Sequence, residues 1–268
     1  MKVYDCFTFY NEFELLELRL NLLQDSVDYF VLVEANRTHK NDAKELLFER
    51  GKKFFSKYLA KIIHIKVEDM PSYDANDPND GWKLENYQRN CITRGLNNLD
   101  PDDLVIISDA DEIPNPQIID FFKNHAQLLD NNTLALRQQL FYYFVNLKCT
   151  DFWYGSVITK FKNLTSPQEL RNKREIFSWF KDGGWHFSYM GGVENILMKL
   201  NATVEAKRAS SNKETMAYIN HCMSNGLDIY NRADVQLEFI DIDNLFPPAV
   251  EAAIQKYPYL YFKTSENG

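Results

Sequence analysis

The chain of 268 residues is long enough to bury a full hydrophobic core, and its content of 45% hydrophobic and 14% aromatic residues is typical of a globular protein. A formal net charge of −8 argues against nucleic acid as the main partner. Because no apolar run approaches the roughly 18 residues that span a bilayer, and no secretion signal is visible, we expect a soluble, cytoplasmic protein without a transmembrane segment.

The first quarter of the sequence alternates between strand-like and helix-like patterns. In chain order, the segments are the strand at 2–9, the helix at 12–24, the strand at 28–35, the helix at 41–58 and the strand at 62–67. This alternation predicts an α/β fold with a doubly wound sheet. Asn11 precedes the first helix and is expected to cap it. Glu34 ends the second strand, where its carboxylate could bind a ribose or base edge, or pair with Arg37.

A polar loop and a helix follow the third strand. Residues 68–81 form a loop of the length typical of binding loops and lids, and residues 82–99 have a helical pattern. Glu85, Gln88 and Arg89 are spaced to lie on one face of that helix. Arg89 could reach a diphosphate bound beside the next strand, or it could form an ordinary surface pair with Glu85.

Residues 104–114 are the most informative segment. The first four are apolar and mostly β-branched, as in a strand buried on both faces of a parallel sheet. Asp109, Asp111 and Glu112 follow at the carboxyl end of this strand, which is the edge where open α/β sheets bind ligands. An Asp-x-Asp pair suits Mg²⁺ or Mn²⁺ held together with a substrate diphosphate, although acidic turns also serve simply as helix caps.

The pattern changes after a further helix at residues 115–129. Residues 134–161 contain apolar segments with clustered aromatic residues and no helical spacing, which predicts long antiparallel strands. Exposed aromatic side chains are also the usual platforms for sugar rings. Further helices are expected at residues 213–224 and 249–257.

A glycine-rich stretch around His186 is the second informative segment. Paired glycines on both sides of Trp185 and His186 would let the backbone approach a ligand closely. His186 could be a third metal ligand or a buried structural histidine. Glu194 is expected near the start of a helix that runs to Leu200.

Several short motifs occur in a fixed order along the chain. They are Tyr4-Asp5-Cys6-Phe7, Asn11-Glu12, the helix through Arg19, Val33-Glu34-Ala35, Trp82 with Glu85, Gln88 and Arg89, Ile107 to Pro114, and Gly184 to Ser188. In this order they resemble glycosyltransferase family 17, whose known animal members add the bisecting N-acetylglucosamine to N-glycans. The resemblance covers most of the chain.

The resemblance implies an inverting glycosyltransferase of the GT-A type, with a Rossmann-like mixed sheet flanked by helices. It implies UDP-N-acetylglucosamine (UDP-GlcNAc) as the sugar-nucleotide donor, a glycan acceptor and a divalent metal. We expect one domain over residues 1–268, with a nucleotide-sugar-binding half at 1–130 and an antiparallel acceptor-side half at 131–268. Because the membrane anchor of the animal enzymes is lacking, a soluble bacterial or viral type of enzyme is expected rather than a Golgi-anchored one.

In this interpretation the Asp-x-Asp motif holds Mn²⁺ or Mg²⁺ against the donor diphosphate. Asp111 is the main ligand, Asp109 contributes directly or through water, and His186 is the candidate third ligand. The residues expected to bind the donor are Asn11, Glu34, Arg89, Asp109 and Trp185.

An inverting displacement also needs a carboxylate that takes the proton of the acceptor hydroxyl. Glu194 is the first candidate, because its Gly-Gly-x-acid layout resembles the base-bearing loop of other inverting GT-A enzymes. Asp182 is the second candidate. Glu112 is the third, since it could instead position the metal loop.

Two other classes of protein remain compatible with the sequence. An apolar run followed by Asp-Ala-Asp also resembles the opening of haloacid-dehalogenase-like phosphatases, in which the first acid, here Asp109, is the nucleophile. That motif normally opens the chain and carries Thr or Val where Ile113 stands. The other class is a non-catalytic glycan-binding relative, in which neutralising Asp111 would leave glycan binding intact.

Overall fold

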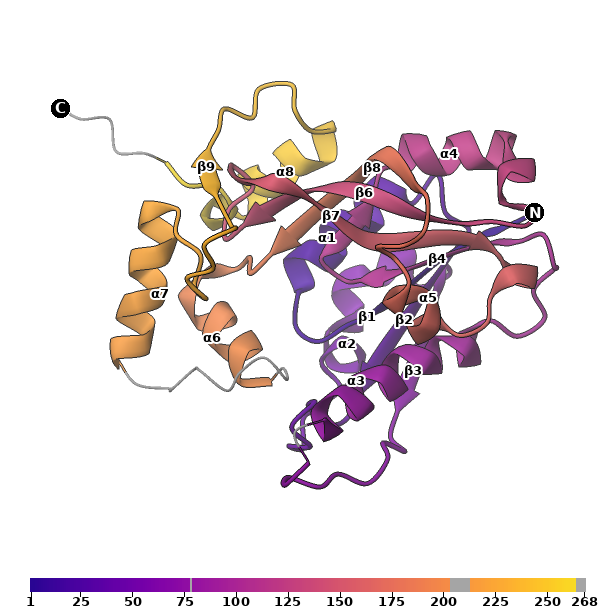
Figure 1. Cartoon of the computed structure of the whole chain (residues 1–268), viewed down its shortest axis with the longest axis horizontal. Coiled ribbons are helices and arrows are strands. Elements are labelled where there is room, and N and C mark those ends of the chain that lie inside the picture. The colour runs from indigo at the N-terminus through magenta and orange to yellow at the C-terminus, as the bar shows by residue number, and fades with distance from the viewer. Residues whose placement is uncertain (78, 203–212, 264–268) are drawn as a thin grey trace.

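The computed structural model describes residues 1–77, 79–202 and 213–263, and in this part of the chain one mixed sheet of nine strands runs through the molecule (Figure 1). The strands are β1 Val3–Thr8, β2 Tyr29–Ala35, β3 Ile62–Val67, β4 Leu104–Asp109, β5 Glu112–Pro114, β6 Thr133–Tyr142, β7 Leu147–Lys160, β8 Trp179–Ser188 and β9 Leu237–Phe239. Their order is β3-β2-β1-β4-β7-β6-β8-β5, with β9 paired to β7.

Helices flank this sheet, so the predicted α/β class is confirmed. Within the described ranges the α-helices are α1 Phe13–Leu23, α2 Leu47–Gly51, α3 Asp80–Asn90, α4 Pro116–Asn124, α5 Pro167–Asn172, α6 Gly192–Ala202, α7 Lys213–Asn225 and α8 Pro248–Lys256. The 3₁₀ helices are η1 Lys52–Tyr58, η2 Cys91–Gly95, η3 Ala126–Leu129, η4 Phe161–Asn163 and η5 Pro258–Leu260. None of the helices described here combines the length and the apolarity that crossing a membrane requires.

The first half of the sheet is parallel. β1 pairs with β2 on one side and with β4 on the other, and β2 pairs with β3, all in parallel. The carboxyl ends of these strands therefore meet at one edge, where Thr8 of β1 lies opposite Asp109 of β4. This edge is where ligands are expected in open α/β sheets.

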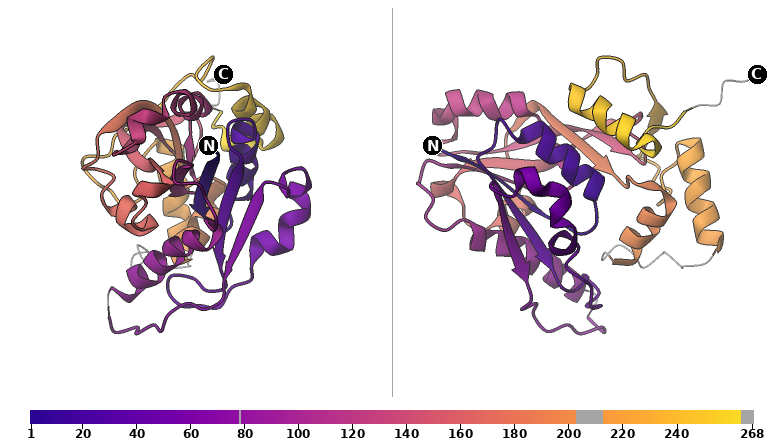
Figure 2. Two further views of the ribbon diagram at one scale, coloured as in Figure 1. Left: turned by 90° about the vertical axis from the view of Figure 1, so that its right-hand side faces the viewer. Right: turned by 180° about the vertical axis from the view of Figure 1, so that it is seen from behind.

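Strand β4 is buried on both faces, as its apolar sequence predicts. Leu104 and Ile106 pack into one core with α1, α4 and α8, and the last of these helices packs on α1 (Figure 2). Val105 and Ile107 pack into a second core beneath η2 and α5. Because both faces of the strand are covered, its residues are apolar without interruption instead of alternating between apolar and polar.

The predicted helix at residues 41–58 is wrong in its first part. Asn41 has a positive φ of 68°, and the N–H of Lys44 donates to the carbonyl of Asn36 instead of to a helical partner. Helix α2 consequently begins only at Leu47 and continues as η1.

Asn11 does not cap α1 with its side chain. Glu12 takes the capping position, and its Oε2 accepts the N–H groups of Tyr10 at 3.2 Å and Asn11 at 3.1 Å. The longer carboxylate bonds to the free N–H groups that precede the helix, while the Asn11 amide contacts the sulfur of Met198.

The second half of the sheet is mostly antiparallel, as expected. β7 pairs antiparallel with β4, β6 and β9, but β8 runs parallel to β6. Helices α6 and α7 contact each other at one end of the molecule (Figure 1). Their residues Ile196 and Ile219 close a third core over β6 and β7.

Candidate active site

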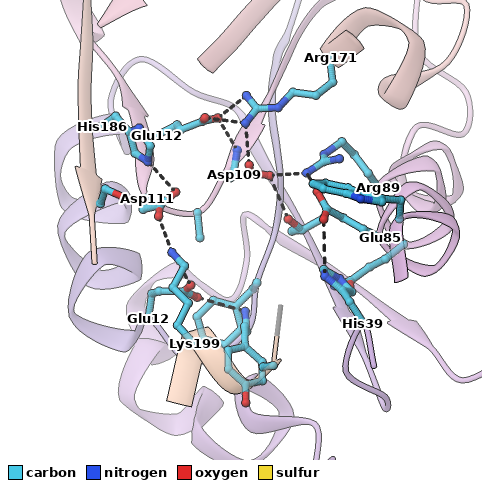
Figure 3. Close-up of a pocket in the computed structure, with 18 of the residues that line it drawn as sticks. Glu12, His39, Glu85, Arg89, Asp109, Asp111, Glu112, Arg171, His186 and Lys199 are labelled. Atoms are coloured by element: carbon cyan, nitrogen blue, oxygen red, sulfur yellow. Dashed lines mark hydrogen bonds and ion pairs between the residues drawn. The ribbon is translucent and has the colours of Figure 1, made fainter. Parts of the chain in front are cut away.

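A cavity of about 660 Å³ lies at the carboxyl edge of the parallel strands, which is a volume typical of sites for small molecules and cofactors. Its walls come from the loop after β1, helix α3, the β4–β5 turn, helix α5, the end of β8 and helix α6 (Figure 3). The residues predicted from the sequence for metal or diphosphate binding that line it include Arg89, Asp109, Asp111, Glu112 and His186.

Asp109, at the end of β4, is held by two arginines from two different helices. Its Oδ1 accepts from Arg89 at 2.9 Å, and its Oδ2 accepts from Arg171 at 2.7 Å. Burial would raise the pKa of this carboxyl, but Arg171 and Arg89 more than offset burial and hold the pKa well below its usual range. Both oxygens are engaged, which does not suit the nucleophile that the phosphatase interpretation requires.

Arg89 both pairs with Glu85 and reaches the cavity beside β4, the two possibilities that its position in the sequence allowed. Its guanidinium pairs with Glu85 one turn earlier on α3 at 3.0 Å, and it also reaches Asp109. The side chain is buried at the cavity wall, so this pair is not an ordinary surface ion pair.

Glu112, the first residue of β5, is a fully buried carboxylate. Arg171 donates two hydrogen bonds to it, at 2.7 and 2.8 Å, and the indole N–H of Trp153 donates a third at 2.5 Å. Its Oε2 also accepts the backbone N–H of Asp109 at 2.8 Å. A bidentate pair of this kind fixes the turn between β4 and β5, so Glu112 supports the site and has no free oxygen for proton transfer.

Asp111 occupies the turn between these two strands and is only 5% exposed. Lys199 of α6 donates to its Oδ2 at 2.6 Å, and Nε2 of His186 lies 3.6 Å from its Oδ1. Burial would raise the pKa of Asp111, but Lys199 and His186 lower it below its usual range. Asp111 is therefore an ionised carboxylate that orients a lysine and a histidine at the cavity wall (Figure 3).

A fully buried arginine, Arg19 of α1, holds the turn between β4 and β5 from the side of the core. It donates to the carbonyls of Asp109 at 2.9 Å, Ala110 at 3.3 Å and Glu112 at 2.9 Å. Its charge is balanced by a two-point ion pair with Asp5 of β1, at 2.6 and 2.7 Å. The backbone that carries the three acids is thus anchored to the core.

The cavity carries more positive than negative charge, although the whole chain has a net charge of −8. Among the described residues, five carboxylates line it: Glu12, Glu85, Asp109, Asp111 and Glu112. Seven cationic side chains in the same described ranges line it: Arg37, Lys44, Arg89, Arg171, Arg174, Lys199 and Arg232. A local excess of cations in an acidic protein indicates an anionic ligand.

Asp109, Asp111 and His186 are not arranged as the predicted metal site. Among the residues that the structure describes, no group of three or more His, Cys, Asp or Glu side chains is placed to hold a metal ion. Arginines take both oxygens of Asp109, and an ammonium group takes one oxygen of Asp111. The donor atoms therefore do not fit a divalent cation in this arrangement.

Three residues expected to bind the donor lie outside the cavity. Trp185 points into the core, where it packs against Phe246. Glu34 is buried beneath α2 and accepts the N–H of Phe48 at 3.0 Å, so it is a structural carboxylate. Asn11 lines a much smaller neighbouring cavity. At Glu34 and Trp185, which lie on strands, the side-chain direction alternates along the strand and could not be assigned from the sequence.

Glu194 and Asp182, the first two candidates for the base, are exposed and line neither cavity. Five positions on a helix correspond to about 140° of rotation, so Glu194 faces away when Lys199 faces the cavity. Asp182 lies four residues before His186 on β8, about 13 Å along the strand.

If the chain transfers a sugar from UDP-GlcNAc, as the family resemblance implies, Glu194→Gln should leave the rate of transfer within about twofold of the unchanged protein, because this side chain does not reach the cavity. Initial rates of UDP release at saturating donor provide the measurement, with Asp182→Asn in parallel. Loss of a base removes about 10²-fold or more. A loss of that size in either variant would return that carboxylate to the reaction.

Arg171, Lys199 and the aromatic wall of the cavity were not predicted from the sequence. Arg171 sits on a one-and-a-half-turn helix capped by Ser166, and nothing in that segment signals a site. The aromatic wall consists of Tyr142, Trp153, Tyr189 and Tyr230. The aromatic cluster in the second half of the sequence was the available signal for it.

Comparison with known proteins shows which family the chain belongs to. The model for glycosyltransferase family 17 matches residues 1–258. The β-1,4-mannosyl-glycoprotein 4-β-N-acetylglucosaminyltransferases of Homo sapiens and Rattus norvegicus are each 31% identical to the chain over 140 residues. The match covers 50% of this chain and 26% of each relative, so the chain matches about a quarter of their length.

Among solved structures, S. aureus TarS 1-349 is similar with a TM-score of 0.40 and 14% identity, covering 84% of this chain and 71% of that chain. The same TarS fragment in complex with UDP-GlcNAc gives a TM-score of 0.41 with 11% identity, covering 84% and 72%.

Proposed function

Since this chain belongs to glycosyltransferase family 17, we propose that it transfers N-acetylglucosamine from UDP-GlcNAc to a hydroxyl group of a glycan. The curated relatives are named for N-acetylglucosamine transfer to a glycoprotein. The charge of the cavity supports the proposal most directly, because seven cationic side chains of the described residues line a cavity at the ligand-binding edge of the sheet. A sugar nucleotide presents the anionic diphosphate that such a site would bind.

Two groups of aromatic side chains line the cavity, and they suit a donor and an acceptor. Tyr10, Arg37 and Trp82 lie near the ends of β1 and β2 and on α3, and the Trp82 indole is 45% exposed. Such a ring could stack on a nucleobase. The wall formed by Tyr142, Trp153, Tyr189 and Tyr230 could stack on sugar rings of the acceptor.

The proposed reaction is an inverting displacement at the anomeric carbon. The acceptor oxygen forms the new bond to the anomeric carbon and passes its proton to solvent water in the cavity, while the bond from the anomeric carbon to the diphosphate breaks and leaves its electron pair on UDP. Negative charge therefore grows on the leaving group in the transition state. Arg89 and Lys199 are two of the cavity cations around the Asp-x-Asp turn, and they could offset that charge.

We expect UDP and UDP-GlcNAc to raise the midpoint of thermal unfolding by about 5 to 10 °C. At about 100 times its dissociation constant a ligand stabilises by about 2.7 kcal/mol, which corresponds to that range at this chain length. The measurement is a thermal scan with UDP, UDP-GlcNAc, ADP, GDP and CDP. UDP release from UDP-GlcNAc in the presence of glycans then tests transfer.

A shift for every nucleotide would show anion binding without donor selectivity. The absence of any shift with UDP compounds, in a protein that unfolds cooperatively, would contradict the transferase. Binding of glycans under the same conditions would then support the glycan-binding relative.

A further inference from the structure

Lys199 of α6 places its ammonium group between Asp111, in the turn between β4 and β5, and Glu12, at the start of α1. Its Nζ lies 2.6 Å from Oδ2 of Asp111 and 3.5 Å from Oε1 of Glu12 (Figure 3). Burial would lower the pKa of this lysine, but Asp111 and Glu12 raise it above its usual value, so the group is cationic. It lines the main cavity and remains partly open to it, with 24% of the side chain exposed.

The backbone before α6 determines where this lysine stands. Gly191 and Gly192 have φ values of 96° and 83°, which side-chain-bearing residues rarely adopt. They turn the chain sharply after β8, and α6 then buries Ile196 and Leu200 in the third core. Lys199, between these two on the helix, is directed to the cavity from a packed helix rather than from a loop.

The carboxylates around Lys199 have little capacity left for a divalent ion. Asp109 is paired with two arginines, and Glu112 is paired with Arg171 and Trp153. Of the carboxylates that the structure describes, only Asp111 and Glu12 form ion pairs with Lys199, so the ammonium group already occupies the point between them. An ion at this point would have to displace Lys199.

We propose that Lys199 is the cation that binds the donor diphosphate, in the position where a divalent metal was expected from the sequence. This inference rests on the proposed transferase function. An ammonium group has three N–H donors, so one can bond to Asp111 while others bond to phosphate oxygens. As the bond from the anomeric carbon breaks and its electron pair passes to UDP, the fixed positive charge stabilises the leaving group.

Binding of UDP to the full chain, measured by isothermal titration calorimetry, tests this role. In EDTA the unchanged protein should bind UDP, and Mn²⁺ should change its affinity less than threefold. Lys199→Met should weaken binding by about 10- to 100-fold, as expected for the loss of a charge-assisted hydrogen bond. Lys199→Arg should retain most of the affinity. Lys123→Met, a partly exposed lysine of α4 outside the cavity, is the matched control and should bind normally.

The outcomes separate this inference from the proposed function. UDP binding that requires Mn²⁺ and is indifferent to Lys199→Met would overturn the role of Lys199 and leave the transferase standing. No UDP binding by the unchanged protein, with or without Mn²⁺, would overturn both. Thermal unfolding of each variant confirms that a weakened variant is still folded, and a folded Lys199→Met protein with normal affinity would overturn the inference.

Discussion

Arg19→Met should lower the free energy of unfolding by about 4 kcal/mol, a fall of about 10 °C or more in the unfolding midpoint. The substitution would leave Asp5 as an uncompensated carboxylate in a site where neither side chain is exposed. It would also remove the donor to three backbone carbonyls of the Asp109–Glu112 turn. Each unsatisfied buried polar group is destabilising by about 1–3 kcal/mol. Because the substitution leaves several such groups, the expected loss of about 4 kcal/mol assumes that the turn relaxes and that some of these groups find other partners.

Urea unfolding of the variant provides this measurement, and Arg50→Met is the matched control. Arg50 pairs with Glu45, but the two side chains are 73% and 65% exposed, so its loss should change stability by about 0.5 kcal/mol or less. Arg19→Lys keeps the charge without the forked geometry and should fall between the two. Equal stability of the Arg19 and Arg50 variants would show that the buried arginine does not anchor the turn.

The parallel half of the fold could be predicted from the sequence because its signals are local. β4 is a continuous apolar run that ends in acids, and β3 was predicted with the bounds that the structure has. Carboxyl ends of parallel strands share an edge, so the order of strands also predicted that Asp109 and Asp111 would face a ligand site. The position of Arg89 beside this ligand site could be predicted in the same way, because its helix directly precedes β4 in the sequence.

The remainder of the site depends on contacts between distant segments. Arg171 lies 62 residues from Asp109 in the sequence, and Lys199 lies 88 residues from Asp111. Nothing near either basic residue shows which acid it will meet, so the acids looked free to bind a metal. The position of Glu194 outside the cavity has a different reason, because its helix was predicted but the side of that helix facing the cavity was not.

Asp111→Asn should reduce the rate of UDP release from UDP-GlcNAc by about 10²- to 10³-fold. The new side chain has nearly the same shape but no charge, so the 2.6 Å ion pair that fixes Lys199 becomes a weaker hydrogen bond. A misplacement of about 1 Å in a charge-stabilising group can remove 10²-fold in rate. Asp243→Asn, which neutralises an exposed acid outside the cavity, is the control and should keep the full rate.

Combining this substitution with Lys199→Met distinguishes two roles for Asp111. If Asp111 acts by orienting Lys199, the double variant should be no slower than the slower single variant, because residues that act as a unit are strongly non-additive. If Asp111 instead contributes independently, as a metal ligand would, the two losses should multiply, and added Mn²⁺ should accelerate the Lys199→Met protein but not the Asp111→Asn protein. Initial rates of the four proteins with and without Mn²⁺ therefore show whether the positive charge beside the diphosphate comes from Lys199 or from a bound metal ion.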